Sequence, residues 1–365
     1  MRAGRRLVLA VWTTSIAGCG EPPVLEDCLP NNGMRPICLF QAPEDLAVVG
    51  HWLILSQMPT PSRPGSLLAF HPESATVRRL YPPAGAVVTQ PPAGADAAAA
   101  PGAAADGSAK TGCGPGGPPT FDDFAPHGID VSGTRLLVVD HGSREGIEAF
   151  TLSADRGGPV VTWKGCTPLP DDVAANDVVA LDDGGFAVTK MVERPQWLGI
   201  AKLVLGLKTG ALLRHGPADV GFTVVPNTAG QAPNGVEVDA EGRFWIAEWT
   251  GHRVVRVAPD GSTREVVALD FSPDNLAWSA DGRLLVTGQR ASVFDVPGCA
   301  AIERGTCALP AVVVAVDPVS LEVHPIVDDD PPTVLGPASI AVELDGDLWI
   351  GGFAGNRLVR REGVR

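Results

Sequence analysis

The sequence predicts an all-β fold, a six-bladed β-propeller. Two observations lead to this prediction. Short apolar runs alternate with tight turns rich in Gly and Asp, as expected for antiparallel strands, and one short polar segment recurs six times, each time ahead of such a run. Repeats that come as close as about 40 residues, with several strands in each, are typical of propeller blades. We therefore expect six blades around a central channel.

The clearest copy of the repeat is the fourth, at residues 232–257. Its polar corner around Asn234 precedes a short alternating strand at 236–238. A Gly-containing turn leads to an apolar strand at 244–249, and a second turn leads to a strand at 253–257. Strands joined by turns this short form an antiparallel meander, which is the repeating unit of the chain.

The other five copies keep the same order of corner and apolar runs. In chain order they are 43–46 with 52–55 and 66–70, 126–129 with 136–140 and 147–152, 175–178 with 186–189 and 201–205, 273–276 with 284–287 and 312–316, and 337–340 with 348–350 and 357–359. We expect residues 36–40 to form a strand that closes the ring against the last blade. The Ala-, Pro- and Gly-rich segment 82–119 is a low-complexity insert that no blade requires.

The corners supply a ring of polar side chains. In a propeller the innermost strand of each blade lines the channel, so the residues just ahead of these strands meet at one mouth. In blade order the first position is Glu44, His127, Asn176, Asn234, Asp274 and Ala338, and the second is Asp45, Gly128, Asp177, Gly235, Asn275 and Ser339. Turns alone favour Asn, Asp and Gly. They do not explain two carboxylates, two amides and a histidine at one position.

Two histidines belong to the second copy. His141 follows the run 136–140, and His127 lies just ahead of the strand that pairs with it. Antiparallel neighbours place the end of one strand beside the start of the other, so we expect the two imidazoles to be close. A lone histidine is more often structural, but a pair with one member in the polar ring favours a functional role. Further candidates at the rim follow or end second strands: Glu248, His252 and Gln289.

The ring has the chemistry of a calcium site. Carboxylate and amide oxygens without thiols are hard ligands, which favour calcium over zinc or copper. The expected ligands are Glu44, Asn176, Asn234, Asp274 and Asn275. One residue further along each strand, Asp45 and Asp177 could hold a second ion with backbone carbonyls.

The first 19 residues are typical of an export signal. Three arginines within residues 1–6 precede a short apolar run at 7–17, which is too short to span a membrane. The segment that ends at Cys19 resembles a bacterial lipobox, with ordinary signal cleavage as the alternative. We therefore expect a signal peptide at 1–19, a tether at 20–35 and the propeller at 36–365. The mature protein would be exported to the bacterial cell envelope, either periplasmic or attached by lipid to the outer membrane.

Charge and cysteine content narrow the class further. A net charge of −14 argues against nucleic acid as a partner, because that requires a basic face. Without Cys19, six cysteines remain, an even number that suggests disulfides in an exported chain. The local pairs are Cys28 with Cys38 and Cys299 with Cys307, which leaves Cys113 with Cys166. The sequence alone leaves all other pairings open.

The corner motifs resemble a known family. From Glu44 to Arg360 the segments P-E-D-L, F-A-P-H-G-I, L-L-V-V-D-H, N-D-V-V-A, P-N-G-V and D-N-L are similar to those of the paraoxonase/arylesterase family, in the same order. The resemblance implies a six-bladed propeller with two calcium ions. It assigns the catalytic calcium to Glu44, Asn176, Asn234, Asp274 and Asn275, the deeper calcium to Asp45, Asp177 and the carbonyl of Ile129, and a catalytic dyad to His127 and His141. Gluconolactonase-like propellers share only part of this pattern.

The expected function is calcium-dependent hydrolysis of lactones or aryl esters. The calcium ion would polarise the carbonyl of a small-molecule substrate, and the histidines would activate a water molecule. Two alternatives stay open. One is a gluconolactonase-like sugar lactonase in which the histidines are incidental, and the other is a non-enzymatic envelope propeller that uses calcium for stability and its rim for binding.

Overall fold

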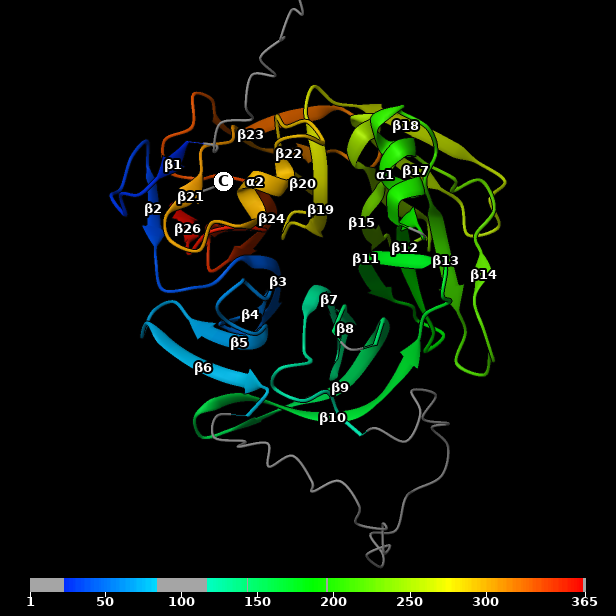
Figure 1. Cartoon of the computed structure of the whole chain (residues 1–365), viewed down its shortest axis with the longest axis horizontal. Helices are drawn as coiled ribbons and strands as arrows, with labels where there is room; N and C mark the ends of the chain where they lie inside the picture. The colour runs from blue at the N-terminus through cyan, green and yellow to red at the C-terminus, as the bar shows by residue number, and fades with distance from the viewer. Residues whose placement is uncertain (1–22, 84–116, 143, 195, 364–365) are drawn as a thin grey trace, which may run out of the picture.

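The computed structural model describes residues 23–83, 117–142, 144–194 and 196–363. Its strands form six four-stranded antiparallel sheets that follow one another around a central axis (Figure 1). The prediction of a six-bladed propeller is confirmed. The predicted signal peptide, Cys19 and most of the insert 82–119 lie outside the described residues. Among the residues that are described, no helix is long and apolar enough to cross a membrane.

Each of the first three blades is built from four strands that are consecutive in the chain. Blade 1 contains β3 (Pro43–Val49), β4 (Trp52–Gln57), β5 (Ser66–His71) and β6 (Thr76–Tyr81). Blade 2 contains β7 (Pro126–Ser132), β8 (Arg135–Asp140), β9 (Gly146–Asp155) and β10 (Gly158–Pro168). Blade 3 contains β11 (Val173–Ala180), β12 (Phe186–Glu193), β13 (Ala211–His215) and β14 (Thr223–Val224).

The last three blades carry two short additions. Blade 4 contains β15 (Pro233–Val238), β16 (Phe244–Glu248), β17 (Arg253–Val257) and β18 (Arg264–Ala268), with the 3-10 turn η1 (Trp249–Gly251). Blade 5 contains β19 (Ser272–Trp278), β20 (Leu284–Gln289), β22 (Ala311–Val316) and β23 (Val323–Asp329), with α2 (Val296–Ala300) and β21 (Thr306–Cys307) inserted. Blade 6 contains β24 (Ala338–Leu344), β25 (Asp347–Gly352) and β26 (Leu358–Arg361), and a strand from the N-terminal region completes it.

The two ends of the chain close the ring. Strand β2 (Met34–Ile37) pairs with β26, as expected of a closing strand, and begins two residues earlier than predicted. The prediction that residues 20–35 form a tether is in part wrong, because β1 (Val24–Leu25) pairs with β21 on blade 5. Residues 24–25 and 34–35 therefore belong to the folded body rather than to a free linker.

One predicted strand is a helix. The apolar run 201–205 was expected as the third strand of blade 3, but it lies largely in α1 (Gln196–Val204), and the strand is β13, further along. A short apolar run does not by itself distinguish a helix from a strand. The run continues a segment that starts at Gln196, and Leu198, Ala201, Lys202 and Leu203 within it are good helix formers.

The apolar core lies between neighbouring blades. One cluster joins Ile54 and Leu67 of blade 1 to Leu136 of blade 2. Another joins Trp245 of blade 4 to Leu284 of blade 5. Burying a side chain of this size contributes about 1.5–3 kcal/mol. These contacts fix each blade against the next, so the innermost strands form a rigid frame.

Two of the expected disulfides are present. Cys28 is bonded to Cys38, and Cys299 is bonded to Cys307. The third expected pair includes Cys113, which lies outside the described residues.

Candidate functional site

Every innermost strand is irregular at the residues predicted to form the ring. The strands nearest the central axis are β3, β7, β11, β15, β19 and β24 (Figure 1). Their pairing with the second strand of the blade shifts register between Pro43 and Asp45, Pro126 and Ile129, Ala175 and Val178, Pro233 and Val236, Pro273 and Leu276, and Ala338 and Ile340. A β-bulge redirects the side chains at its position. The repeated corner of the sequence is thus a repeated bulge at one mouth of the channel.

The bulges bring four blades into contact. The Glu44 carboxylate of blade 1 accepts a hydrogen bond from Asn275 Nδ2 of blade 5 at 2.8 Å, and its Oε1 lies 3.4 Å from His127 Nε2 of blade 2. Asp274 of blade 5 is hydrogen-bonded by the side chain of Asn234 of blade 4. Glu44 therefore meets Asn275, which is 231 positions away in the chain, and His127. Asn176 instead donates from its Nδ2 to Met191 Sδ of the same blade at 3.6 Å.

Several ring oxygens are buried without a hydrogen-bond donor. They are Glu44 Oε2, Asn176 Oδ1, Asn234 Oδ1 and Asn275 Oδ1. An isolated buried acceptor costs about 1–3 kcal/mol. Four of them in one ring, all from carboxylate or amide groups, fit a hard divalent cation. Across the described ranges, no three side chains among His, Cys, Asp and Glu are grouped to hold a metal, so a site here depends on the amides.

Burial changes the ionisation of the two ring carboxylates. It raises the pKa of Glu44 to about 7, against the opposing effect of the hydrogen bond from Asn275. Burial and the charge of Glu44 raise the pKa of Asp274 to about 7, although Gln289 Nε2 donates to Asp274 Oδ2 at 2.9 Å. A bound cation would favour the charged form of both groups.

Asp45 is engaged by the backbone. Its Oδ1 accepts the N–H of Leu46 at 2.8 Å, and its Oδ2 accepts the N–H of Ile129 at 2.6 Å. The second bond joins blade 1 to blade 2. Ile129 thus presents its N–H to Asp45, whereas the expected second calcium site assigns its carbonyl to the ion.

Asp177 forms the same link between blades 3 and 4. Its Oδ1 accepts the N–H of Val178 at 2.7 Å, and its Oδ2 accepts the N–H of Val236 at 2.8 Å. The absence of a side chain at Gly128 permits this approach, because a Cβ there would lie 2.4 Å from Asp177 Oδ1. All four oxygens of the two aspartates are satisfied by backbone donors. Burial and the charge of neighbouring carboxylates raise the pKa of Asp45 and of Asp177 well above the usual range. The second calcium site expected at these two residues stays a prediction.

The two histidines are in direct contact. His127 Nδ1 lies 2.9 Å from His141 Nε2, as expected from their positions on paired strands. Burial lowers the pKa of His127 to about 4. His141 Nδ1 lies 2.7 Å from the carboxylate of Glu145, which in turn accepts a hydrogen bond from Arg194 at 2.6 Å. The sequence analysis missed Glu145 and Arg194, whose only signal is a carboxylate four residues after a histidine.

The three rim candidates have different roles. Gln289 joins the site through its bond to Asp274, and its Oε1 is a further buried oxygen without a donor. Glu248 is fully buried but pairs with Arg253 and Arg264, which is a structural arrangement. His252 is exposed and caps η1 in a left-handed conformation with φ 48°.

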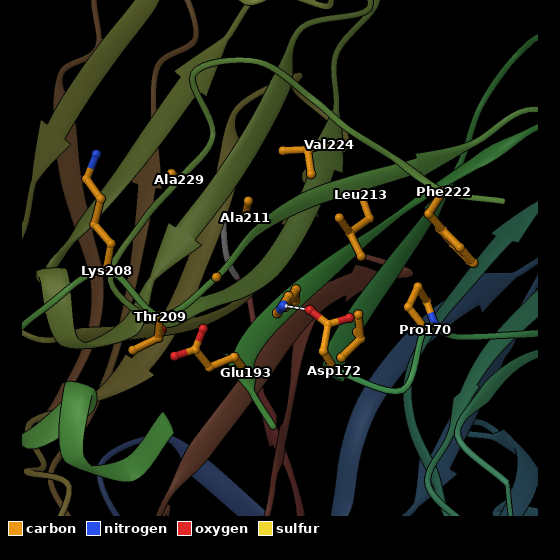
Figure 2. Close-up of a pocket in the computed structure, with 13 residues that line it drawn as sticks. Pro170, Asp172, Glu193, Lys208, Thr209, Ala211, Leu213, Phe222, Val224 and Ala229 are labelled. Carbon is orange, nitrogen blue, oxygen red and sulfur yellow. Dashed lines mark hydrogen bonds and ion pairs between the residues drawn. The ribbon is translucent and has the colours of Figure 1, made fainter. Parts of the chain in front are cut away.

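A separate groove of about 430 Å³ lies on blade 3 (Figure 2). Its floor is apolar and includes Leu213 and Phe222, and its rim includes Asp172 and Lys190, which form an ion pair at 2.5 Å. None of the ring residues lines this groove.

Sequence comparison finds similarity to known proteins over one segment of the chain. Residues 218–290 match the model of the SMP-30/Gluconolactonase/LRE-like region. Over 64 residues the chain is 42% identical to L-arabinolactonase from Azospirillum brasilense, which covers 17% of this chain and 21% of that relative. The chain therefore matches only about a fifth of the curated relative's length. These matches favour the gluconolactonase-like alternative over the paraoxonase/arylesterase family expected from the motifs.

Solved structures share the fold at low identity. A structural-genomics target presented as a candidate gluconolactonase gives a TM-score of 0.52 at 14% identity, covering 92% of this chain and 94% of that one. The luciferin-regenerating enzyme gives 0.53 at 10% identity, covering 90% and 93%. At these identities the likeness supports the propeller fold alone.

Proposed function

We propose that this protein is a lactone hydrolase of the gluconolactonase-like type, with sugar lactones as the substrate class and a calcium ion bound by the polar ring. The observation that carries the proposal is the set of buried ring oxygens without donors. The matched segment 218–290 supports it, because it includes the ring residues Asn234, Asp274 and Asn275.

The residues that would hold the ion are the carboxylates and amides at the bulges. They are Glu44, Asn176, Asn234, Asp274 and Asn275. When bound, calcium supplies a Lewis acid that polarises the lactone carbonyl. Gln289 holds the Asp274 carboxylate in place, and Asp45 and Asp177 hold the backbone of neighbouring blades beneath the ring.

His127 is positioned to move the proton. Its Nε2 lies at the ring, 3.4 Å from Glu44, and its low pKa keeps it neutral at neutral pH, with a lone pair free to take a proton from water. The water oxygen bonds to the carbonyl carbon while its proton goes to His127 Nε2. The ring C–O bond then breaks, and the alkoxide takes that proton to give the hydroxy acid.

The histidine pair is also the feature that favours a second candidate. Lactonases of the paraoxonase type accept aryl esters, and the motifs around His127 and His141 resemble that family. In the sugar-lactonase alternative the same histidines would be incidental. The substrate preference and the effect of removing His127 separate these candidates.

A substrate panel tests the proposal. The purified protein is assayed on a sugar δ-lactone, L-arabinono-γ-lactone, a lipophilic γ-lactone and phenyl acetate, with calcium and then with a chelator. We expect sugar lactones to be hydrolysed best and activity to disappear on chelation and return with calcium. Calcium binding without turnover on any of the four would instead identify a binding propeller.

A variant tests the histidine. His127→Gln should lower the rate by about 10²- to 10⁴-fold if His127 is the general base. Sugar-lactone hydrolysis near the wild-type rate in this variant would show that the histidines are incidental. Aspartate 183, which pairs with Arg214 on blade 3 away from the ring, offers a matched control in Asp183→Asn.

A further inference from the structure

Four side chains form a chain of hydrogen bonds, called the line below, that runs from the ring to a solvent-exposed arginine. His127 Nδ1 meets His141 Nε2 at 2.9 Å, His141 Nδ1 meets Glu145 Oε1 at 2.7 Å, and Arg194 donates to Glu145 Oε2 at 2.6 Å. The Arg194 side chain is 46% exposed, whereas that of Glu145 is 14% exposed. The line therefore begins beside Glu44 and ends at solvent.

Glu145 is a carboxylate in this setting. Burial opposes its charge, but the hydrogen bond from His141 and the charge of Arg194 outweigh burial and hold the pKa of Glu145 below its usual range. The N–H of Ala175 also points toward its Oε1 at 3.4 Å. A charged carboxylate can only accept hydrogen bonds, so the proton in its contact with His141 lies on His141 Nδ1.

The proton on His141 Nδ1 determines which histidine donates in the contact between His127 and His141. With Nδ1 protonated, a neutral His141 has a free lone pair at Nε2, which can only accept. The 2.9 Å contact then requires His127 to donate from Nδ1. His127 in turn keeps its lone pair on Nε2, the nitrogen that lies 3.4 Å from Glu44.

We propose that Glu145, braced by Arg194, is a positioning residue that fixes both histidines in the Nδ1–H tautomer and leaves the basic nitrogen of His127 at the ring. Its role resembles that of the carboxylate that orients the histidine of a hydrolase triad, where the wrong tautomer costs about 10⁴-fold in rate. The catalytic consequence rests on the proposed lactone hydrolysis, whereas the tautomers do not.

The line also gives a route for the proton. After His127 gains a proton at Nε2, its Nδ1 proton can pass to His141 Nε2. The resulting imidazolium of His141 is then stabilised by the Glu145 carboxylate. The reverse transfer returns the proton to the leaving oxygen, so the sequence conserves protons and needs no further reactant.

Nitrogen chemical shifts of the histidine side chains test the proposal on the full-length, ¹⁵N-labelled protein, above the usual pKa of histidine. We expect protonated Nδ1 and bare Nε2 at both His127 and His141 in the wild type. An Nε2–H tautomer at either residue would overturn the proposal, and this result requires neither a variant nor activity.

Variants extend the test. In Glu145→Gln the amide can either donate or accept, so we expect both tautomers at His141 and a kcat on the best lactone lowered by about 10²- to 10⁴-fold with little change in KM. The control Asp183→Asn removes a carboxylate–Arg214 pair of blade 3, away from the histidines, and should leave the tautomers unchanged. Unchanged tautomers in a folded Glu145→Gln protein would contradict the proposal. A wild type that shows the expected tautomers but hydrolyses no lactone would refute the proposed function and still support this inference.

Discussion

The ring at the channel mouth and the groove on blade 3 both contain polar side chains, but these side chains differ in whether they have hydrogen-bond or ion-pair partners. In the groove, Lys190 is paired with Asp172, and Thr209 donates to the backbone of Met191 at 2.6 Å. In the ring, Glu44 and Asn234 each keep a buried oxygen without a donor. The groove is a hollow of about 430 Å³ in which these polar groups have partners, whereas the ring has buried acceptors without donors that a ligand could satisfy.

The difference shows which observation identifies a site in this fold. Paired charges stabilise a surface and need nothing more, whereas unsatisfied buried acceptors destabilise the protein until something binds them. The following predictions test this distinction, from the largest expected effect to the smallest.

Removing one ring carboxylate should abolish function. We expect Glu44→Gln to lower lactone hydrolysis by at least about 10²- to 10³-fold, since electrostatic stabilisation at the carbonyl depends on the ion that this carboxylate holds. The same change should remove stabilisation of the fold by calcium. Thermal unfolding with and without calcium, together with kcat/KM, measures both, and full activity in this variant would show that the ring is not the site.

The pH dependence of stability should reveal the ring acids when calcium is removed. The folded-state pKa values of Glu44 and Asp274 are both raised to about 7, so the native state binds more protons than the unfolded chain between about pH 4 and pH 7. Stability of the chelated protein should therefore fall as pH rises through this window. Each acid could contribute roughly 3–4 kcal/mol to this loss, and the two contributions are not additive.

Calcium should reverse this trend, because it binds the charged carboxylates and gains affinity as they lose protons. Urea unfolding at a series of pH values, with chelator and with calcium, gives the comparison. A chelated protein whose stability stays level or rises between pH 4 and pH 7 would contradict the burial of these two acids.

Loss of Gln289 should have a smaller effect. Gln289 contacts the expected ligand Asp274 but is not itself an expected ligand. Residues that orient a metal ligand typically contribute about 10- to 100-fold to metal affinity. Gln289→Leu should weaken calcium binding by this amount and leave the fold intact. A calcium affinity equal to that of the wild type would mean that Asp274 needs no such support.

The groove should be the least sensitive region. Asp172→Asn breaks the pair with Lys190 at a surface where such pairs contribute about 0–1 kcal/mol. We expect lactone hydrolysis and calcium affinity to stay within about 2-fold of the wild type. A loss comparable to that of Glu44→Gln would place the groove in the active site.

The repeated corner explains why the sequence predicted so much of this architecture. Each copy joins a polar bulge to an apolar strand. The six copies of the corner, the first at Glu44 and the last at Ala338, therefore locate both the six blades and the channel mouth. Position within the repeat also predicted the contact of His127 with His141. Because every copy folds in the same way around one axis, equivalent positions of the repeat lie close together in space.

What the repeat does not encode could not be predicted. Residues 201–205 form part of a helix because the insertion before β13 belongs to blade 3 alone. Glu145 lies in a turn, and its link to Arg194 of the next blade follows no period. The hydrogen bonds that satisfy Asp45 and Asp177 also depend on side-chain direction at a bulge, which spacing does not fix.

Calorimetric titration of the calcium-free protein with calcium tests the central claim most directly, with Glu44→Gln and Asp172→Asn measured alongside. We predict one bound ion per chain in the wild type and in Asp172→Asn, and none in Glu44→Gln. No binding to the wild type, or equal binding to all three proteins, would show that the buried oxygens of the ring do not hold the ion.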